Sequence, residues 1–195
     1  MTSKGFVSRG TISMLKQNVP STIKVYSQIE SHPELSDLQQ AYINVHSEQY
    51  DCIIALGGGS VLDSAKFFSV VPKQVNGQLP IDTLTNIVKG TASDRCYDTL
   101  PIISIPTTSG TGSEITPWAT IWDSTQKKKY SLHLPELYSE AAIYDPNLTI
   151  SLPLDITRQT ALDTLSHALE SIWNKHASAI TVQHATTAAQ LIFKH

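Results

Sequence analysis

Short apolar runs alternate with helical periodicity through the first three quarters of the chain. Four such runs predict strands, and they are Ile23–Tyr26, Cys52–Leu56, Pro101–Ile105 and Ala141–Tyr144. Between them, Pro33–Glu48 and Ser60–Val71 place apolar residues at helical spacing. A fully apolar run such as Cys52–Leu56 (CIIAL) is typical of a parallel sheet that is buried on both faces. Residues 119–122 and 130–132 flank a polar turn and predict a hairpin.

The pattern changes near residue 150. From Asp155 onward only helical periodicity remains, with one run over residues 156–173 and another over residues 180–194. Strand–helix alternation followed by helices alone predicts an α/β domain with a parallel sheet over residues 1–150, and the start of an all-α domain over residues 151–195. The first residues are polar and loop-like, and the last helix has no cap. We therefore expect the chain to be truncated at both ends.

Composition and charge narrow the function classes. The 195 residues are 41% hydrophobic and carry a net charge of −3, with no basic face, so we expect no nucleic-acid partner. No apolar run is long enough to span a membrane, and the N-terminus lacks the apolar core of a secretory signal. Two cysteines, Cys52 and Cys96, cannot form a disulfide framework. We expect a soluble, cytoplasmic protein without a membrane partner.

The turn Gly57-Gly58-Gly59-Ser60 lies between a predicted buried strand and a predicted helix. Glycines let the backbone approach a phosphate closely, and a helix N-terminus offers unpaired N–H groups and partial positive charge. An ordinary strand–helix turn in which Ser60 caps the helix is the alternative. Three successive glycines after an apolar strand favour phosphate binding. The spacing differs from the six-residue dinucleotide fingerprint, so it does not name the ligand.

Two further motifs could carry chemistry. The loop Pro106–Glu114 (PTTSGTGSE) follows the next predicted strand, at the sheet edge where α/β proteins bind ligands, although a solvated loop is the alternative. Asp163 and His167 are four residues apart and so lie on one helix face. A carboxylate and an imidazole suit Zn²⁺ or Fe²⁺, but a local ion pair is the alternative, and two ligands are too few for a closed site.

Together these motifs resemble the iron-containing (group III) alcohol dehydrogenase family. The resemblance rests on Cys52–Lys66 (CIIALGGGSVLDSAK), Pro101–Thr116 (PIISIPTTSGTGSEIT) and Ala142–Glu170, which ends in DTLSHALE. It implies a Rossmann-like dinucleotide-binding domain followed by the first helices of a metal-binding domain. It also implies an NAD- or NADP-dependent enzyme that uses a divalent metal, Fe²⁺ or Zn²⁺, and acts on a small alcohol or aldehyde.

The resemblance assigns roles residue by residue. The implied cofactor-binding residues are Gly58, Gly59, Ser60, Asp63, Thr107, Thr108, Thr111 and Lys129. The implied metal ligands are Asp163 and His167, and the family's two other histidine ligands lie beyond this sequence. No protein group beyond the metal is implied to be catalytic. Ser27 matches a position that is acidic in many NAD-dependent members, which leaves NADP open. Ala161 replaces a usual glycine before the metal-binding Asp.

Several alternatives stay open. Residues 129–133 and the ALESIW segment resemble the phosphonoacetaldehyde reductase-like branch of the family. A glycerol-1-phosphate dehydrogenase or a dehydroquinate synthase-like enzyme would use the same cofactor turn with other metal ligands, and Asp163 with His167 favours the alcohol dehydrogenase. An inactive nucleotide-binding fragment is the non-enzymatic alternative. The oligomeric state is open, with a homodimer as one alternative.

Overall fold

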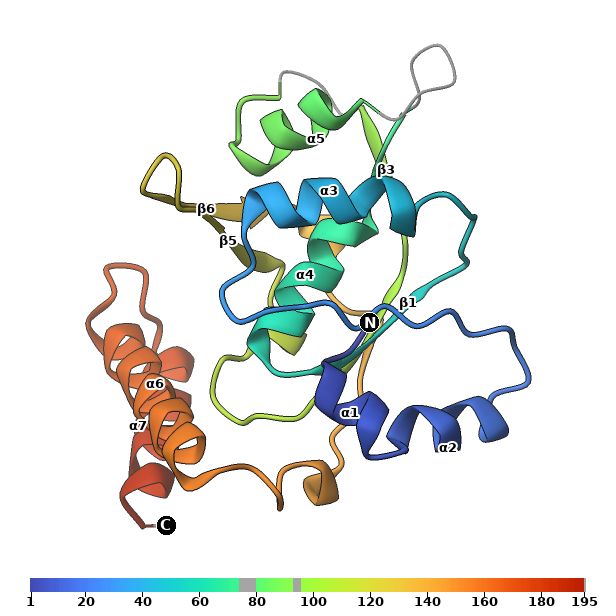
Figure 1. Ribbon diagram of the computed structural model, residues 1–195. Helices are drawn as coiled ribbons and strands as arrows, with labels where there is room; N and C mark the ends of the chain where they lie inside the picture. Colours follow the sequence, from blue (N-terminus) through green and yellow to red (C-terminus); the bar gives the residue numbers. More distant parts are fainter. Residues whose placement is uncertain (74–79, 93–95, 195) are drawn as a thin grey trace. The chain divides into compact units, whose positions relative to one another are not determined.

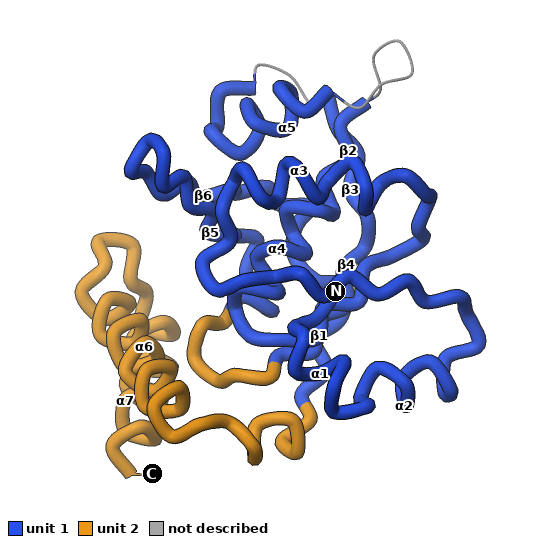
Figure 2. The backbone as a smooth tube through the Cα atoms, in the orientation of Figure 1, with its two compact units in different colours: residues 1–106, 113–144 blue, residues 107–112, 145–195 orange. Residues whose placement is uncertain are grey.

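The computed structural model describes residues 1–73, 80–92 and 96–194, and the chain divides into two compact units (Figures 1 and 2). The first unit comprises Met1–Pro106 and Ser113–Tyr144. The second comprises Thr107–Gly112 and Asp145–His195. The loop Thr107–Gly112 therefore groups with the C-terminal helices, although it is flanked in sequence by the first unit.

A parallel sheet lies in the first unit, as the sequence predicts. It consists of β1 (Ile53–Gly57), β4 (Ile102–Pro106) and β7 (Ala141–Ala142), in the order β1-β4-β7. Both pairings are parallel, and Gly57 is paired with Pro106. The carboxyl ends of β1 and β4 are therefore level, so the segments that follow these two strands start from the same edge of the sheet.

The N-terminal segment differs from the sequence prediction. Residues expected to be loop form α1 (Lys4–Ser8) and α2 (Thr11–Asn18), and Thr2 makes a parallel bridge to Leu56 in β1. The predicted strand Ile23–Tyr26 is wrong, because this segment forms no strand. The Tyr26 carbonyl oxygen accepts one hydrogen bond from Thr2 N (2.9 Å) in the short N-terminal segment.

Helix α4 (Gly59–Ser69) runs through the core of the first unit. Every residue from Ser64 to Ser69 is buried. The predicted helix reached Val71, but Val70–Pro72 instead forms β2, which pairs antiparallel with β3 (Tyr97–Thr99). Helix α3 (Leu35–Val45) lies within the predicted range 33–48, whereas α5 (Ile81–Val88) was not predicted. The last core element is the predicted hairpin, β5 (Trp118–Asp123) with β6 (Lys128–His133).

A buried aromatic group joins α3 to α4. Tyr42 packs edge-to-face on Phe67 and donates a hydrogen bond to the Val70 carbonyl oxygen (2.6 Å). His46 is stacked on Tyr42, and its Nε2 donates to the Phe68 carbonyl oxygen (2.7 Å). Burial lowers the pKa of His46, against a smaller opposing effect of that hydrogen bond. The folded chain therefore favours the neutral imidazole.

The lowered pKa of His46 predicts how the stability of the fold depends on pH in the acid range. The unfolded chain protonates His46 near its ordinary pKa of about 6.5, and the folded chain does so only at lower pH. In that window the unfolded state binds more protons, so the free energy of unfolding falls as the pH drops. Urea unfolding should show that the free energy of unfolding falls more between pH 7 and pH 5 for the wild type than for His46→Phe. Equal losses would contradict the prediction.

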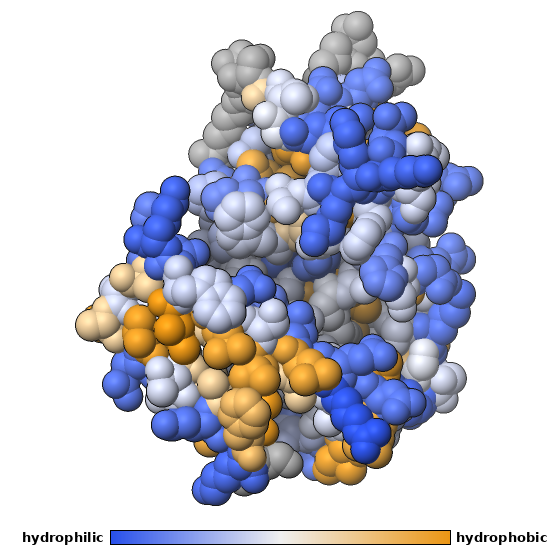
Figure 3. All heavy atoms as spheres, turned by 90° about the vertical axis from the view of Figure 1, so that its left-hand side faces the viewer, coloured by the Kyte–Doolittle hydropathy of each residue, from blue (hydrophilic) through white to orange (hydrophobic). Residues whose placement is uncertain are grey.

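The second unit contains the two predicted helices, α6 (Leu154–Trp173) and α7 (Ala179–Lys194), which pack on each other. Ala168 and Ala185 are buried, while many larger apolar side chains are exposed, among them Leu162, Trp173, Ile180 and Phe193. Figure 3 shows apolar side chains gathered on the face that these helices present. Among the described residues, no helix is both long enough and apolar enough to cross a membrane.

Candidate cofactor turn and metal-ligating pair

The glycine turn connects β1 to the N-terminus of α4. Gly57 is buried, and a Cβ there would lie 2.5 Å from Val61 Cγ2, so close packing requires glycine at this position. Gly58 is the N-cap and has no side chain to accept from the first helical N–H groups. Gly58, Gly59 and Ser60 are all partly exposed. The turn thus leaves backbone amides and the positive end of the helix dipole accessible to an anion.

Two other segments reach this edge of the sheet. Ser60 Oγ accepts a hydrogen bond from the His32 backbone N (3.4 Å). Thr2 forms a parallel bridge with Leu56 of β1. The next residue, Ser3, is therefore level with Gly57, the last residue of β1. Sequence reasoning missed Ser3, because two residues are too few to show a strand pattern.

Asp63 lies one turn into α4, and its contacts are internal. Its Oδ1 accepts from Ser113 Oγ (2.7 Å) and its Oδ2 accepts from Thr120 N (2.9 Å). Burial raises the pKa of Asp63, whereas the two hydrogen bonds and the charge of Lys66 lower it. Its role toward a cofactor stays a prediction, and in the structure it joins α4 to the segment that follows the threonine loop.

Sequence reasoning missed Lys66, which completes this network. Its side chain is fully buried, and Nζ donates to Ser113 O (2.6 Å), Ser113 Oγ (2.8 Å) and Trp118 O (2.6 Å). Burial lowers the pKa of Lys66 to about 8, and the nearby carboxylates of Asp63 and Glu114 oppose this. The sequence did offer a signal, because Lys66 is followed directly by the apolar run FFSVV. A charged side chain in such a buried helix needs a hydrogen-bonding partner inside the protein.

The threonine loop and Lys129 lie in different units. Thr107 is buried directly after β4, and Thr108 and Thr111 are partly exposed. Gly110 and Gly112 have positive φ angles of 127° and 64°, which favour glycine. Lys129 lies on β6 in the first unit, with Nζ 5.7 Å from the centre of the Trp122 ring. The structure thus gives Lys129 a cation–π partner in addition to its predicted role.

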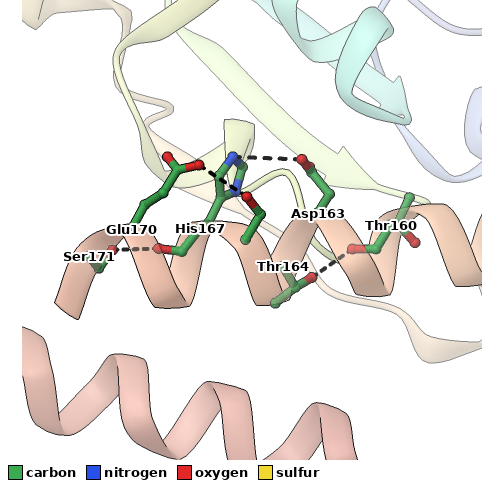
Figure 4. A network of polar contacts seen from close by, with 7 residues as sticks. Thr160, Asp163, Thr164, His167, Glu170 and Ser171 are labelled. Atoms are coloured by element: carbon green, nitrogen blue, oxygen red, sulfur yellow. Dashed lines mark hydrogen bonds and ion pairs between the residues drawn. The ribbon is translucent and has the colours of Figure 1, made fainter. Parts of the chain in front are cut away.

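Asp163 and His167 lie side by side on α6, as the spacing predicts (Figure 4). Asp163 Oδ1 and His167 Nε2 are 3.7 Å apart, and both side chains are about half exposed. Two ligands on one metal ion, with bonds of about 2.0–2.2 Å at a tetrahedral angle, are roughly 3.4 Å apart. The pair therefore fits two corners of a metal site after a small side-chain adjustment.

The described residues supply no third ligand beside this pair. None of their His, Cys, Asp and Glu side chains form a group of three that could hold a metal ion. His184 on α7 lines the same groove as His167, a hollow of about 440 Å³ between the two helices, but it does not complete such a group. His176 and His184 were not expected to be ligands.

Comparison with known proteins gives a family match. The family model for iron-containing alcohol dehydrogenase matches residues 1–146. The 1-propanol dehydrogenase PduQ of Citrobacter freundii is 34% identical over 194 residues, which cover 98% of this chain and 47% of that protein. The long-chain-alcohol dehydrogenase 1 of Geobacillus thermodenitrificans is 34% identical over 88% of this chain and 42% of its own length. The chain spans about half the length of the curated relatives it matches.

Solved structures agree in fold. A sulfoacetaldehyde reductase from Bifidobacterium kashiwanohense, solved in complex with NAD⁺, has a TM-score of 0.84 and 28% identity, over 99% of this chain and 50% of that chain. An NADH-dependent butanol dehydrogenase from Thermotoga maritima has a TM-score of 0.81 and 27% identity, over 99% and 48%. The Rossmann-like α/β fold expected from the sequence is confirmed.

Proposed function

The chain belongs to the iron-containing alcohol dehydrogenase family, and we propose that the protein it represents transfers hydride between a nicotinamide dinucleotide and a small alcohol or aldehyde. The observation that carries this proposal is that one chain contains both an open glycine turn at the sheet edge and the Asp163–His167 pair on α6. The first suits a pyrophosphate and the second suits a divalent metal ion.

The backbone of the glycine turn is proposed to bind the pyrophosphate of the cofactor. Amides at the start of α4 would donate to the pyrophosphate, and the helix dipole would offset its charge. Gly58 and Gly59 have no side chains that would keep the phosphates away, and Ser60 adds a hydroxyl. Thr107, Thr108 and Thr111 would supply hydroxyls to the nicotinamide and its ribose, as the family resemblance implies. Support for NAD comes from the neighbour solved with NAD⁺, and NADP stays open because Ser27 is uncharged.

Asp163 and His167 would hold the metal ion through Oδ1 and Nε2. When bound, Fe²⁺ or Zn²⁺ supplies Lewis-acid polarisation of the substrate oxygen. The chain's own contribution is orientation: successive turns of α6 fix the carboxylate and the imidazole on one face. No protein nucleophile is required, because the nicotinamide carries the hydride chemistry.

The proposed substrate class rests on the names of similar proteins, and the proposed compartment rests on the cysteines. Relatives carry names such as 1-propanol dehydrogenase and long-chain-alcohol dehydrogenase, and one structural neighbour is a sulfoacetaldehyde reductase. These names support a short alcohol or aldehyde, including one with an anionic group. Cys52 and Cys96 are free thiols, which supports a reducing compartment such as the cytoplasm.

The enzymatic proposal is tested with NADH and an aldehyde series under anaerobic conditions with Fe²⁺ or Zn²⁺. Oxidation of NADH that depends on both the aldehyde and the metal supports it. The alternative is an inactive nucleotide-binding module, favoured by the presence of only two ligands among the described residues. That alternative predicts NADH binding with no turnover at any metal concentration.

A second prediction concerns metal affinity. With two protein ligands instead of the usual three, the 195-residue chain should bind Zn²⁺ weakly. Replacing one of two ligands should still matter, so Asp163→Ala and His167→Ala should each lower the affinity by at least about tenfold. Competition against a chromogenic zinc chelator measures this, with His176→Ala as the matched control. Tight, stoichiometric zinc binding that survives both substitutions would place the metal elsewhere.

A further inference from the structure

Gly110, in the middle of the threonine loop, packs directly against α6. Both segments belong to the second unit, and Figure 2 draws them in one colour. A Cβ on Gly110 would overlap the Thr160 carbonyl oxygen and would lie 2.6 Å from Thr164 Oγ1. The bare Cα of the glycine therefore contacts one turn of the helix, at a distance that no side chain permits.

The two helix groups under Gly110 are held together by a hydrogen bond. Thr164 Oγ1 donates to the Thr160 carbonyl oxygen (2.8 Å), so the two groups that meet the loop are bonded to each other (Figure 4). The nearer of them is backbone, which cannot rotate away as a flexible side chain could. Gly110 also has a φ of 127°, a conformation that L side chains rarely adopt. Two independent features thus require glycine here.

The contacted turn is the one that carries the predicted metal ligands. Thr160 and Thr164 bracket Asp163, and His167 is one turn further along α6. On the other side of the contact, Gly110 is one residue from Thr111 and two residues from Thr108, which are predicted to bind the cofactor. A displacement of the loop at Gly110 therefore displaces these hydroxyls relative to the Asp163–His167 pair.

We propose that Gly110 is a positioning residue, which seats the threonine loop on α6 and so fixes the spacing between the bound nicotinamide and the metal ligands. This rests on the proposed function for the roles of the threonines and of the Asp–His pair. To restore normal contact distances, a methyl group at Gly110 must move the loop by about 1 Å, an amount that costs on the order of a hundredfold in a reaction between positioned groups.

The test uses the wild-type chain and three variants. Gly110→Ala pushes the loop away from α6, and Thr164→Leu does the same from the helix side without straining the loop backbone. Gly90→Ala is the matched control, because Gly90 also has a positive φ (68°) but no atom within 4 Å of an added Cβ. Circular dichroism and thermal unfolding verify that each variant is folded.

Two readouts are measured, and neither needs turnover. Amide hydrogen exchange of residues 107–112 and 157–167 reports whether the loop is seated on the helix. Mn²⁺ is titrated in until the enhancement no longer rises, because a two-ligand site binds it weakly, and it enhances the NMR relaxation of bound NADH protons according to their distance from the ion. The nicotinamide H4 protons report the spacing, and the wild type should show strong enhancement there.

In Gly110→Ala and Thr164→Leu we expect faster exchange in both segments and a nicotinamide enhancement reduced by about twofold or more, from a shift of about 1 Å. Gly90→Ala should change neither. If amide exchange is unchanged in both variants, Gly110 does not hold the loop on α6. If amide exchange changes but the relaxation of the nicotinamide protons does not, Gly110 holds the loop without setting the position of the nicotinamide. If the wild type binds no NADH while the exchange responds as expected, the proposed function fails, and the positioning role fails with it.

Discussion

Gly59→Val is expected to abolish NADH binding to this chain. A branched side chain at Gly59, the third residue of the turn, would lie where the backbone must approach the pyrophosphate, and it would cover the amides at the start of α4. Loss of charge-assisted hydrogen bonds, each contributing about 1.5–3 kcal/mol, predicts an affinity lower by a hundredfold or more. Calorimetric titration of NADH into the wild type and the variant measures this directly.

The control for this substitution is Ser36→Val. Ser36 is an exposed residue in the first turn of α3, so it places the same side chain near a helix N-terminus outside the glycine turn. We expect Ser36→Val to bind NADH with wild-type affinity. Equal NADH affinity for the wild type and Gly59→Val would mean that the turn is a structural connection and that the dinucleotide, if it binds, binds elsewhere.

Lys66→Met should cause the largest loss of stability in the chain. The substitution removes an ammonium group with three hydrogen bonds and leaves the acceptors Ser113 O and Trp118 O without their donor. It also leaves the buried carboxylate of Asp63 without its countercharge. Breaking a buried charge network by removing one partner costs about 3–5 kcal/mol. Urea unfolding should therefore show a free energy of unfolding lower by about this amount.

Lys128→Met is the matched control, because Lys128 is exposed on β6. It should change the free energy of unfolding by less than about 0.5 kcal/mol. In a double-mutant cycle, Asp63→Asn combined with Lys66→Met should cost clearly less than the sum of the single losses, since the two side chains share Ser113. Additive losses would show that Asp63 and Lys66 act independently.

Elements with a strong hydrophobic pattern were predictable from the sequence. The apolar runs at β1 and β4 are typical of buried strands in a parallel sheet, and α6 and α7 each show helical periodicity over their whole length. The hairpin followed from two short strands around a polar turn. In each case the local pattern and the tertiary environment favour the same structure, so no long-range information was needed.

Errors in the predicted fold occur where strand pairing or tertiary contacts determine the secondary structure. Residues Ile23–Tyr26 have β-branched character, but they form no strand, and the Tyr26 carbonyl oxygen accepts a single hydrogen bond from Thr2 N in place of a strand ladder. Helices α1 and α2 have only five and eight residues, too few to show a helical repeat clearly. Val70–Pro72 continues the apolar run of α4, and only its pairing with β3 ends the helix at Ser69.

The candidate site was predictable as far as it depends on local spacing. The glycine turn and the Asp163–His167 pair are each contained in a few residues, and the structure places the pair on one helix face. Lys66 and Gly110 were missed, because their roles come from contacts with residues about fifty positions away in sequence. Whether the predicted threonines and Lys129 contact a cofactor stays a prediction.

The most direct test of the central claim is an amide NMR titration of the ¹⁵N-labelled chain with NADH. The claim is that a nicotinamide dinucleotide binds at the carboxyl edge of the parallel sheet. The predicted result is saturable shifts of the Gly58, Gly59 and Ser60 amides, together with those of Thr108 and Thr111, at one common affinity. Shifts confined to other residues, or an unchanged spectrum at millimolar NADH, would contradict the claim.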